Sequence, residues 1–364
     1  MKILVINTVP TAANGITNVI LNYIGAMDKQ DLAIDYLSIS DPESSYCNIL
    51  DISFDNWFVL KRSPKSIVSY FFGLRKLILT KSYDVVHVHG NSHTVVLELL
   101  ASFFGGCKRR IVHAHTTKTS HKIMHFLLLP LFRALCTKGV ACGSDAAKWM
   151  FGKREGVLIL KNGVNVEKFA FDALERGLYR ERLGWGEDLV VLGHVGYFLP
   201  VKNQSYIVDI FNEVYKTDRR YRLLLIGDGE LKPYVEQKVS NLGLSDVIRF
   251  TGDVTNVNSW LNAIDVILMP SLHEGLPLTL VEQQASGLLC VVSDTITKEV
   301  DLTGLVSFLP LSTFTNEWVE KVKEIAEVVD DRKKKSDAAI LCINKEGYNI
   351  SMAAEDMKLM YINK

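Results

Sequence analysis

Paired cysteines and long apolar runs are both missing from this 364-residue chain. Its six cysteines are scattered without a C-x-x-C pair, so the sequence indicates neither a zinc site nor a disulfide framework. The longest apolar run of the first half, Phe126–Phe132, contains Pro130 and is far shorter than the roughly 20 residues of a membrane-spanning helix. The run Lys2–Asn7 is too short for a signal peptide and is predicted as a first strand. We therefore expect a cytoplasmic protein.

The chain also has a net charge of zero, because 41 basic side chains balance 41 acidic ones. The balance hides an asymmetry, because residues 1–170 carry 20 Lys and Arg against 12 Asp and Glu, whereas residues 171–364 carry 21 against 29. Residues 61–154 hold 16 basic and three acidic side chains. This basic region is expected to attract an anionic membrane surface or a phosphate-bearing acceptor, with solvated helix faces as the alternative. Nucleic acid is not an expected partner.

Short apolar, β-branched runs recur along the chain with helical or loop segments between them, as in parallel sheets with crossover helices. The strands predicted in the first half are Ile3–Asn7, Ala33–Ser38, Val85–His89, Arg110–His115, Gly139–Ala141 and Val157–Leu160. Those in the second half are Leu189–Val195, Arg222–Ile226, Val247–Phe250, Val266–Met269 and Leu288–Val292. Two such series predict two doubly wound α/β domains.

A stretch with few apolar residues, 162–188, separates the two series and contains Asn-Gly and Gly-Trp-Gly turns. We predict an N-terminal domain over residues 1–175 and a C-terminal domain over residues 176–344. The tail, 345–364, has apolar side chains at mixed helical spacing. It is predicted to form a final helix that packs back on the first domain.

The segment 270–287, PSLHEGLPLTLVEQQASG, follows directly on a predicted buried strand. Gly275 and Pro277 favour a loop, and Pro277 suits the first turn of a helix, where an N–H would be unpaired anyway. The free N–H groups and positive dipole end of this helix, around Leu278 and Thr279, are expected at the carboxyl edge of the sheet. Such a helix start suits a diphosphate.

Glu274 and Glu282 lie before and inside this helix, one on each side of the expected phosphate position. Ionised carboxylates accept hydrogen bonds strongly, so one can bind sugar hydroxyls and the other ribose hydroxyls. The two glutamates, with seven residues between them, a Glu-Gly-Leu-Pro flank and a following Ala-Ser-Gly, resemble the hallmark of family 4 of the retaining glycosyltransferases. A helix start with incidental acids is the alternative.

This resemblance implies the α/β fold called GT-B, in which two Rossmann-like, doubly wound domains face a central cleft. The N-terminal domain would bind the acceptor, and the C-terminal domain would bind the nucleotide sugar.

A second match is the segment 194–203, HVGYFLPVKN, which begins in the first predicted strand of the second domain. In the family, the loop after this strand carries an arginine and a lysine that neutralise the departing diphosphate. Lys202 occupies the lysine position and Asn203 follows it, but Tyr197 stands in place of the arginine. Because tyrosine brings no charge, stabilisation of the leaving group is expected to rest on Lys202, the helix start and the N–H groups of Gly275 and Leu276.

Histidines follow two predicted strands of the first domain. Family members place a histidine where it reaches a hydroxyl of the donor sugar, and His115 fits that position best. His113 shares its strand face, so the assignment could shift by two residues; a hydrogen-bonded structural pair is the other alternative. His87 and His89 are expected to line the acceptor side and not to hold a metal, because they lie on a separate strand without a carboxylate.

Three further positions match the family more weakly. Gly15 lies in the loop after the first strand, where family members bring glycines close to the donor phosphate. Gly227 belongs to a Gly-Asp-Gly segment that resembles the rim of the nucleotide pocket, and Arg249 lies in the next strand, near whose end the base stacks. Ordinary turns are the alternative. No loop carries Asp-x-Asp, the signature of metal-bridged diphosphate binding, so neither a divalent ion nor another cofactor is expected.

The matching strings look most like those of bacterial enzymes that build capsular polysaccharide or exopolysaccharide. The resemblance implies transfer of a hexose or N-acetylhexosamine, with retention, from a uridine-linked donor to a lipid-linked or glycan acceptor. Residues 119–132 are expected either to dip into the inner face of the membrane or to form a buried helix. A catalytically silent partner subunit and a UDP-sugar 2-epimerase are the alternative functions.

Overall fold

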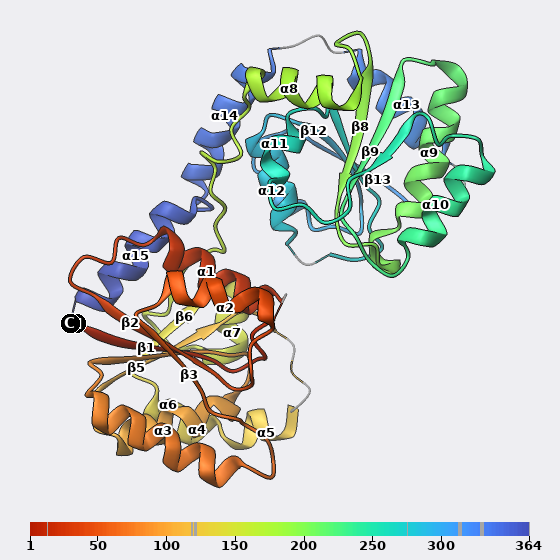
Figure 1. The fold of residues 1–364 in the computed structure, drawn as a ribbon. Coiled ribbons are helices and arrows are strands. Elements are labelled where there is room, and N and C mark those ends of the chain that lie inside the picture. Colours follow the sequence, from red (N-terminus) through yellow and green to blue (C-terminus); the bar gives the residue numbers. More distant parts are fainter. Residues whose placement is uncertain are drawn as a thin grey trace. The chain divides into compact units, whose positions relative to one another are not determined.

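The computed structural model describes residues 1–12, 14–117, 119, 122–274, 276–311, 315–327 and 331–363. It divides into two compact units, which Figure 1 shows in ribbon form. Unit 1 consists of Met1–Gly163 and Ile350–Lys364, and unit 2 consists of Val164–Asn349. The chain passes from unit 1 into unit 2 after Gly163, earlier than the expected domain end at residue 175.

Unit 1 is built on a seven-stranded parallel sheet in the order β3-β2-β1-β4-β5-β6-β7. The strands are β1 (Lys2–Asn7), β2 (Ala33–Ser38), β3 (Asn56–Val59), β4 (Val85–His89), β5 (Arg109–Ala114), β6 (Lys138–Ala141) and β7 (Leu158–Ile159). The direction of winding reverses between β1 and β4. The loops after these two strands therefore diverge, and such switch points are where α/β sheets bind ligands.

Helices cover both faces of this sheet (Figure 1). One face packs against α3 (Ile67–Lys81), α4 (Val96–Phe104), α6 (Leu129–Leu135) and α7 (Ser144–Phe151). The other packs against α1 (Gly15–Ala26), α2 (Ser44–Ser53) and α15 (Ile350–Ile362), the last helix of the chain. Because α15 lies against α1, the end of the chain completes the core of unit 1. The short α5 (Lys122–Leu127) follows β5.

Unit 2 has a six-stranded parallel sheet in the order β10-β9-β8-β11-β12-β13. The strands are β8 (Val190–Val195), β9 (Tyr221–Ile226), β10 (Ile248–Phe250), β11 (Val266–Met269), β12 (Leu289–Ser293) and β13 (Val306–Leu309). Here the switch point lies between β8 and β11.

The helices of unit 2 also form two layers. One face of the sheet packs against α8 (Ala173–Leu183), α11 (Val257–Leu261), α12 (Leu278–Ala285) and α14 (Arg332–Lys345). The other packs against α9 (Gln204–Thr217), α10 (Lys232–Asn241) and α13 (Asn316–Ala326). Among the helices that the structure describes, none is both long enough and apolar enough to cross a bilayer.

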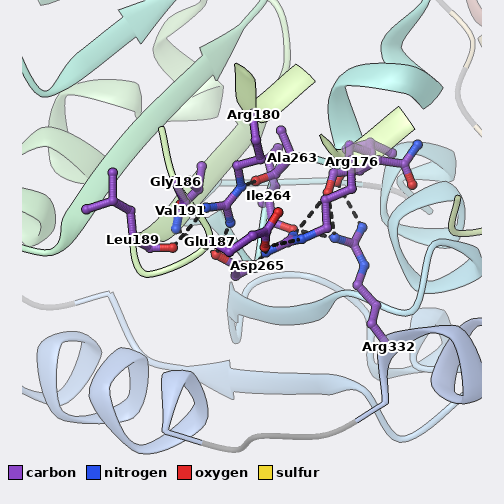
Figure 2. Close-up of polar contacts among 12 residues, drawn as sticks. Arg176, Arg180, Gly186, Glu187, Leu189, Val191, Ala263, Ile264, Asp265 and Arg332 are labelled. Carbon is purple, nitrogen blue, oxygen red and sulfur yellow. Dashed lines mark hydrogen bonds and ion pairs between the residues drawn. The ribbon is translucent and has the colours of Figure 1, made fainter. Parts of the chain in front are cut away.

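A partly buried charge network ties the first of these layers together (Figure 2). Both oxygens of Asp265, at the start of β11, accept from arginines of α8, with Arg180 Nη2 at 2.6 Å and Arg176 Nη2 at 2.9 Å. Arg332 at the start of α14 donates to the carbonyls of Leu261 at 2.9 Å and Ser286 at 3.0 Å. Since Ser286 caps the end of α12, this network fixes both β11 and α12.

The eleven predicted strands all form, each within one residue of its predicted ends. The sequence reasoning missed β3 and β13, which lie at the edges of their sheets and pair with one neighbour each. Most of their residues are only half-buried, so neither strand carries the continuous apolar signal of a central strand.

Candidate functional site

Two loops meet at the switch point of unit 2, one after β8 and one after β11. Lys202 ends the short 3₁₀ turn Pro200–Lys202 in the first loop, and Glu274 lies in the second. Lys202 Nζ is 2.5 Å from Glu274 Oε1, and the two side chains are 19% and 15% exposed. The structure therefore brings together the two residues that the sequence predicted as catalytic in this unit, and it leaves both partly open to solvent.

The pairing depends on how the two loops are held. Asn203 adopts a left-handed conformation with φ 57° and ψ 38°, which asparagine tolerates better than most residues. Its side-chain Nδ2 donates to the carbonyl of Pro270 at 3.2 Å, and the Leu272 N–H donates to the carbonyl of Val201 at 2.8 Å. Asn203, predicted to bind the donor, thus joins the loop of Lys202 to that of Glu274.

Helix α12 begins at Leu278, with Pro277 as its N-cap. The side chains of Leu276 and Leu278 pack against the core of unit 2, so these residues can reach a ligand only through their backbone groups. Thr279 is half-buried in the first turn. Gly275, also predicted to bind the donor, lies outside the described residues.

Glu282 lies in the middle of α12 and is half-buried. Burial raises the pKa of its carboxyl to about 7, although the positive charge of Lys168 opposes the shift. A carboxyl with this pKa changes its charge within the physiological range. It accepts strong hydrogen bonds only in the ionised form.

Gly227 is required by the fold itself. Its φ is +133°, and a Cβ atom there would lie 2.2 Å from the carbonyl oxygen of Gly196. The loops after β8 and β9 therefore cross in backbone contact, which no other residue allows. The sequence reasoning missed the role of Gly196 in this contact. A glycine directly after β8 was the signal that could have indicated a close backbone approach there.

Two other predicted donor-binding side chains do not join the Lys202 and Glu274 pair. Tyr197 is 58% exposed, and its carbonyl accepts from Gln204 Nε2 at 2.9 Å. Arg249 Nη1 donates to the carbonyls of Ser245 at 3.0 Å and Ile248 at 3.2 Å, which directs the guanidinium back toward the start of β10.

In unit 1, Gly15 begins α1 just after the N-cap Asn14, whose side chain accepts from Thr17 N–H. A Cβ atom at Gly15 would meet nothing within 4 Å. Packing within the described chain therefore does not require glycine here, unlike at Gly227.

His115 follows the end of β5 and is only partly buried, whereas His113 is fully buried. Asn91 Oδ1 accepts from the backbone N–H groups of His115 at 2.9 Å and Thr116 at 3.1 Å. Nε2 of His115 lies 2.9 Å from Nδ1 of His89. Of these two histidines only His115 is partly exposed, but its Nδ1 is buried without a hydrogen-bond partner among the described residues, so its contact with a donor sugar stays a prediction beside the alternative of a hydrogen-bonded structural pair. The anchoring role of Asn91 was not foreseen.

The prediction that His87 and His89 line the acceptor side is wrong. Both are at most 1% exposed and lie under the helices of unit 1. Their position on separate strands, which was given as a reason against a metal site, does not keep these histidines apart, because β4 and β5 are neighbours and His89 lies opposite His113. The rings of these histidines lie close together at a tilt, with centroids 4.3 Å apart for His87 and His89 and 5.0 Å apart for His89 and His113.

Two units, each with a parallel sheet wound in both directions from a switch point, make up the architecture of the GT-B fold. HepE of Anabaena, solved in complex with UDP, superposes with a TM-score of 0.78 over 100% of both chains at 15% identity. This likeness shows the predicted GT-B fold.

The chain belongs to the glycosyltransferases of group 1 and family 4. Residues 188–328 match the family model described as Glycosyl transferases group 1, and residues 13–168 match that described as Glycosyltransferase Family 4. EpsF of Bacillus subtilis (strain 168), named as a glycosyltransferase, is 31% identical over 86% of this chain and 84% of its own length. The UDP-Gal:alpha-D-GlcNAc-diphosphoundecaprenol alpha-1,3-galactosyltransferase of Escherichia coli is 28% identical, over 84% of this chain and 80% of its own length.

Proposed function

We propose that this glycosyltransferase moves a hexose or N-acetylhexosamine from a UDP-linked sugar to a lipid-linked or glycan acceptor, in the synthesis of a bacterial surface polysaccharide. The observation that carries the proposal is the 2.5 Å pair of Lys202 and Glu274 at the switch point of unit 2, in the loops that lead to α9 and α12. A lysine cation and the N–H groups of a helix start suit a diphosphate, and a carboxylate suits sugar hydroxyls.

The proposed transfer retains the anomeric configuration. The acceptor hydroxyl attacks the anomeric carbon on the face from which the diphosphate leaves, and its proton passes to the leaving phosphate oxygen. Lys202 and the start of α12 stabilise the negative charge that develops on that phosphate. Because they supply positive charge at this point, we propose a transfer step that needs neither a divalent ion nor another cofactor. Glu274 holds Lys202 in place and binds hydroxyls of the sugar, while Glu282 binds those of the ribose.

Unit 1 contributes residues from the loops after β1 and β5. His115 is proposed to contact a hydroxyl of the donor sugar, with its backbone fixed by Asn91. The open space around Gly15 is proposed to admit the donor phosphate, since no side chain of the described residues fills it.

The E. coli relative and HepE support the choice of donor and acceptor. The name of the first specifies a UDP-linked sugar and a diphosphoundecaprenol acceptor, and the second was solved with UDP. We propose the same classes of donor base and acceptor for this chain.

A lipid-linked acceptor calls for contact with a membrane surface, and α5 suits that role. Ile123, Phe126 and Leu127 are 83%, 62% and 68% exposed, and the charged Lys122 adjoins them. Of the residues of α5, only His125 is buried, and it holds the helix against the rest of unit 1. The alternative that this segment is a buried helix is therefore wrong for α5. We propose that α5, with the surrounding basic region, rests on the anionic inner face of the membrane.

The first experiment is a thermal-shift screen of the full chain against UDP- and GDP-linked sugars. At least one UDP-sugar is expected to raise the melting temperature, and Glu282→Gln is expected to reduce that shift. No stabilisation by any sugar in either series would overturn the proposal.

The second experiment follows transfer from the stabilising donor to a polyprenyl-diphosphate sugar. The expected product keeps the anomeric configuration of the donor, as read by nuclear magnetic resonance, and forms equally well with EDTA present. Formation of a second sugar product in the absence of any acceptor would instead indicate an epimerase. Activity that appears only after a companion protein is added would indicate a silent subunit.

A further inference from the structure

Three buried histidines come together where β4 and β5 approach their carboxyl ends. His87 and His89 share one face of β4 because strand residues two apart point the same way, and His113 lies beside them on β5. One ring nitrogen from each of the three lies within 4.8 Å of the others. All three are at most 1% exposed. This face of the sheet is covered by α1 and α15.

Several of these nitrogens lack a hydrogen-bond partner among the described residues. They are Nε2 of His87 and both ring nitrogens of His113. An unpaired buried polar atom costs about 1–3 kcal/mol, so histidine is a poor choice for a site that only has to be packed. Val86, Val88 and Val112 alternate with the histidines along these strands and fill the opposite face of the sheet with ordinary apolar side chains.

The remaining contacts orient the rings. Nδ1 of His87 is 2.6 Å from the hydroxyl of Tyr361, and Nδ1 of His89 is 2.9 Å from Nε2 of His115. A metal-binding histidine uses one nitrogen for the ion and the other for such a partner, which fixes the ring. In His87 and His89, whose Nδ1 atoms have these partners, Nε2 is then left for a ligand.

We propose that His87, His89 and His113 bind one divalent transition-metal ion that favours imidazole, with Zn²⁺ as the reference ion and the fourth position open to water or an anion. Nitrogens at most 4.8 Å apart surround a centre at most about 2.8 Å away, so each ring moves by at most about 0.7 Å to reach a Zn–N distance of about 2.1 Å.

Charge state and burial agree with this assignment. Burial lowers the pKa of His87 to about 3 and holds the pKa values of His89 and His113 well below the usual range. The three rings are therefore neutral at pH 7, which is the form that binds a metal. A buried water molecule is the competing occupant, and the experiment separates the two.

The test uses the untagged full chain, stripped with EDTA and then titrated with Zn²⁺ or Co²⁺ in the absence of donor. One ion per chain is expected, and X-ray absorption of the zinc form should show three imidazole nitrogens at about 2.0–2.1 Å. Failure to retain an ion, or a shell of oxygen ligands only, would overturn the proposal. Because no donor is present, this result is independent of the transfer assay.

Variants locate the ion. His113→Gln is expected to lower Zn²⁺ affinity at least as much as the roughly tenfold loss typical of an outer-shell change, whereas His273→Gln, an exposed histidine of unit 2, leaves it unchanged. If His113→Gln does not fold by circular dichroism, Tyr361→Phe removes only the hydroxyl beside His87. That variant should also lose about tenfold in affinity. Unchanged affinity in whichever of the two is folded would overturn the assignment.

Discussion

The raised pKa of Glu282 leads to a specific dependence of donor binding on pH. With a pKa of about 7, the carboxyl is about one-tenth ionised at pH 6 and about nine-tenths ionised at pH 8. The ionised form accepts the ribose hydroxyls, so affinity should rise with pH. The dissociation constant of the donor is then expected to fall about tenfold from pH 6 to pH 8.

Isothermal titration calorimetry with a UDP-sugar measures this directly. A UDP-sugar is preferred to UDP because it has no terminal phosphate whose second ionisation, near pH 6, would add its own pH dependence. Glu282→Gln should bind more weakly and show a nearly constant dissociation constant across this range. Glu299→Gln, an exposed glutamate of the same unit, serves as the matched control and should keep the wild-type slope. A flat wild-type profile, or an equal slope in Glu282→Gln, would refute the reasoning.

Further predictions concern single substitutions. Lys202→Ala is expected to lower kcat by about 100-fold or more with a smaller change in KM, because the charge it supplies matters most as the phosphate leaves; equal kinetics would remove Lys202 from the site. Gly15→Ala should leave the melting temperature unchanged and weaken donor binding, and unaltered binding would indicate an ordinary strand–helix turn. Arg332→Met should lower the free energy of unfolding by about 3 kcal/mol, since it leaves several buried carbonyls unpaired; a loss below about 1 kcal/mol in urea titration would contradict this. Phe126→Ser should reduce binding to anionic vesicles in a flotation assay without affecting donor binding, and undiminished flotation would exclude α5 as the contact.

Much of the fold follows from local signals in the sequence. A central parallel strand is buried on both faces, so its apolar run marks it clearly, as in Val266–Met269. The convergence of Lys202 and Glu274 was also foreseeable, because both follow strands that flank a switch point. Their roles in catalysis remain predictions.

Other features depend on tertiary neighbours that no local pattern specifies. Arg332 begins the run RKKK, which reads as a solvated helix face, yet its guanidinium is buried among carbonyls from distant segments. The burial of His87 and His89 likewise depends on α15, which is more than 250 residues away in sequence and contributes Tyr361 at 2.6 Å. The sequence shows a histidine pair at a strand end, but it does not show that a helix from the far end of the chain covers it.

The path of the chain, which leaves unit 1 at Gly163 and returns at Ile350, also bears on how the protein is made. During translation, unit 2 has all of its residues before unit 1 does, because α15 follows unit 2 in the chain. Until then the apolar surface of α1 that α15 covers stays open to chaperones and to aggregation. A stop codon just before Ile350 would therefore damage the N-terminal half of the enzyme and spare the half in which it occurs.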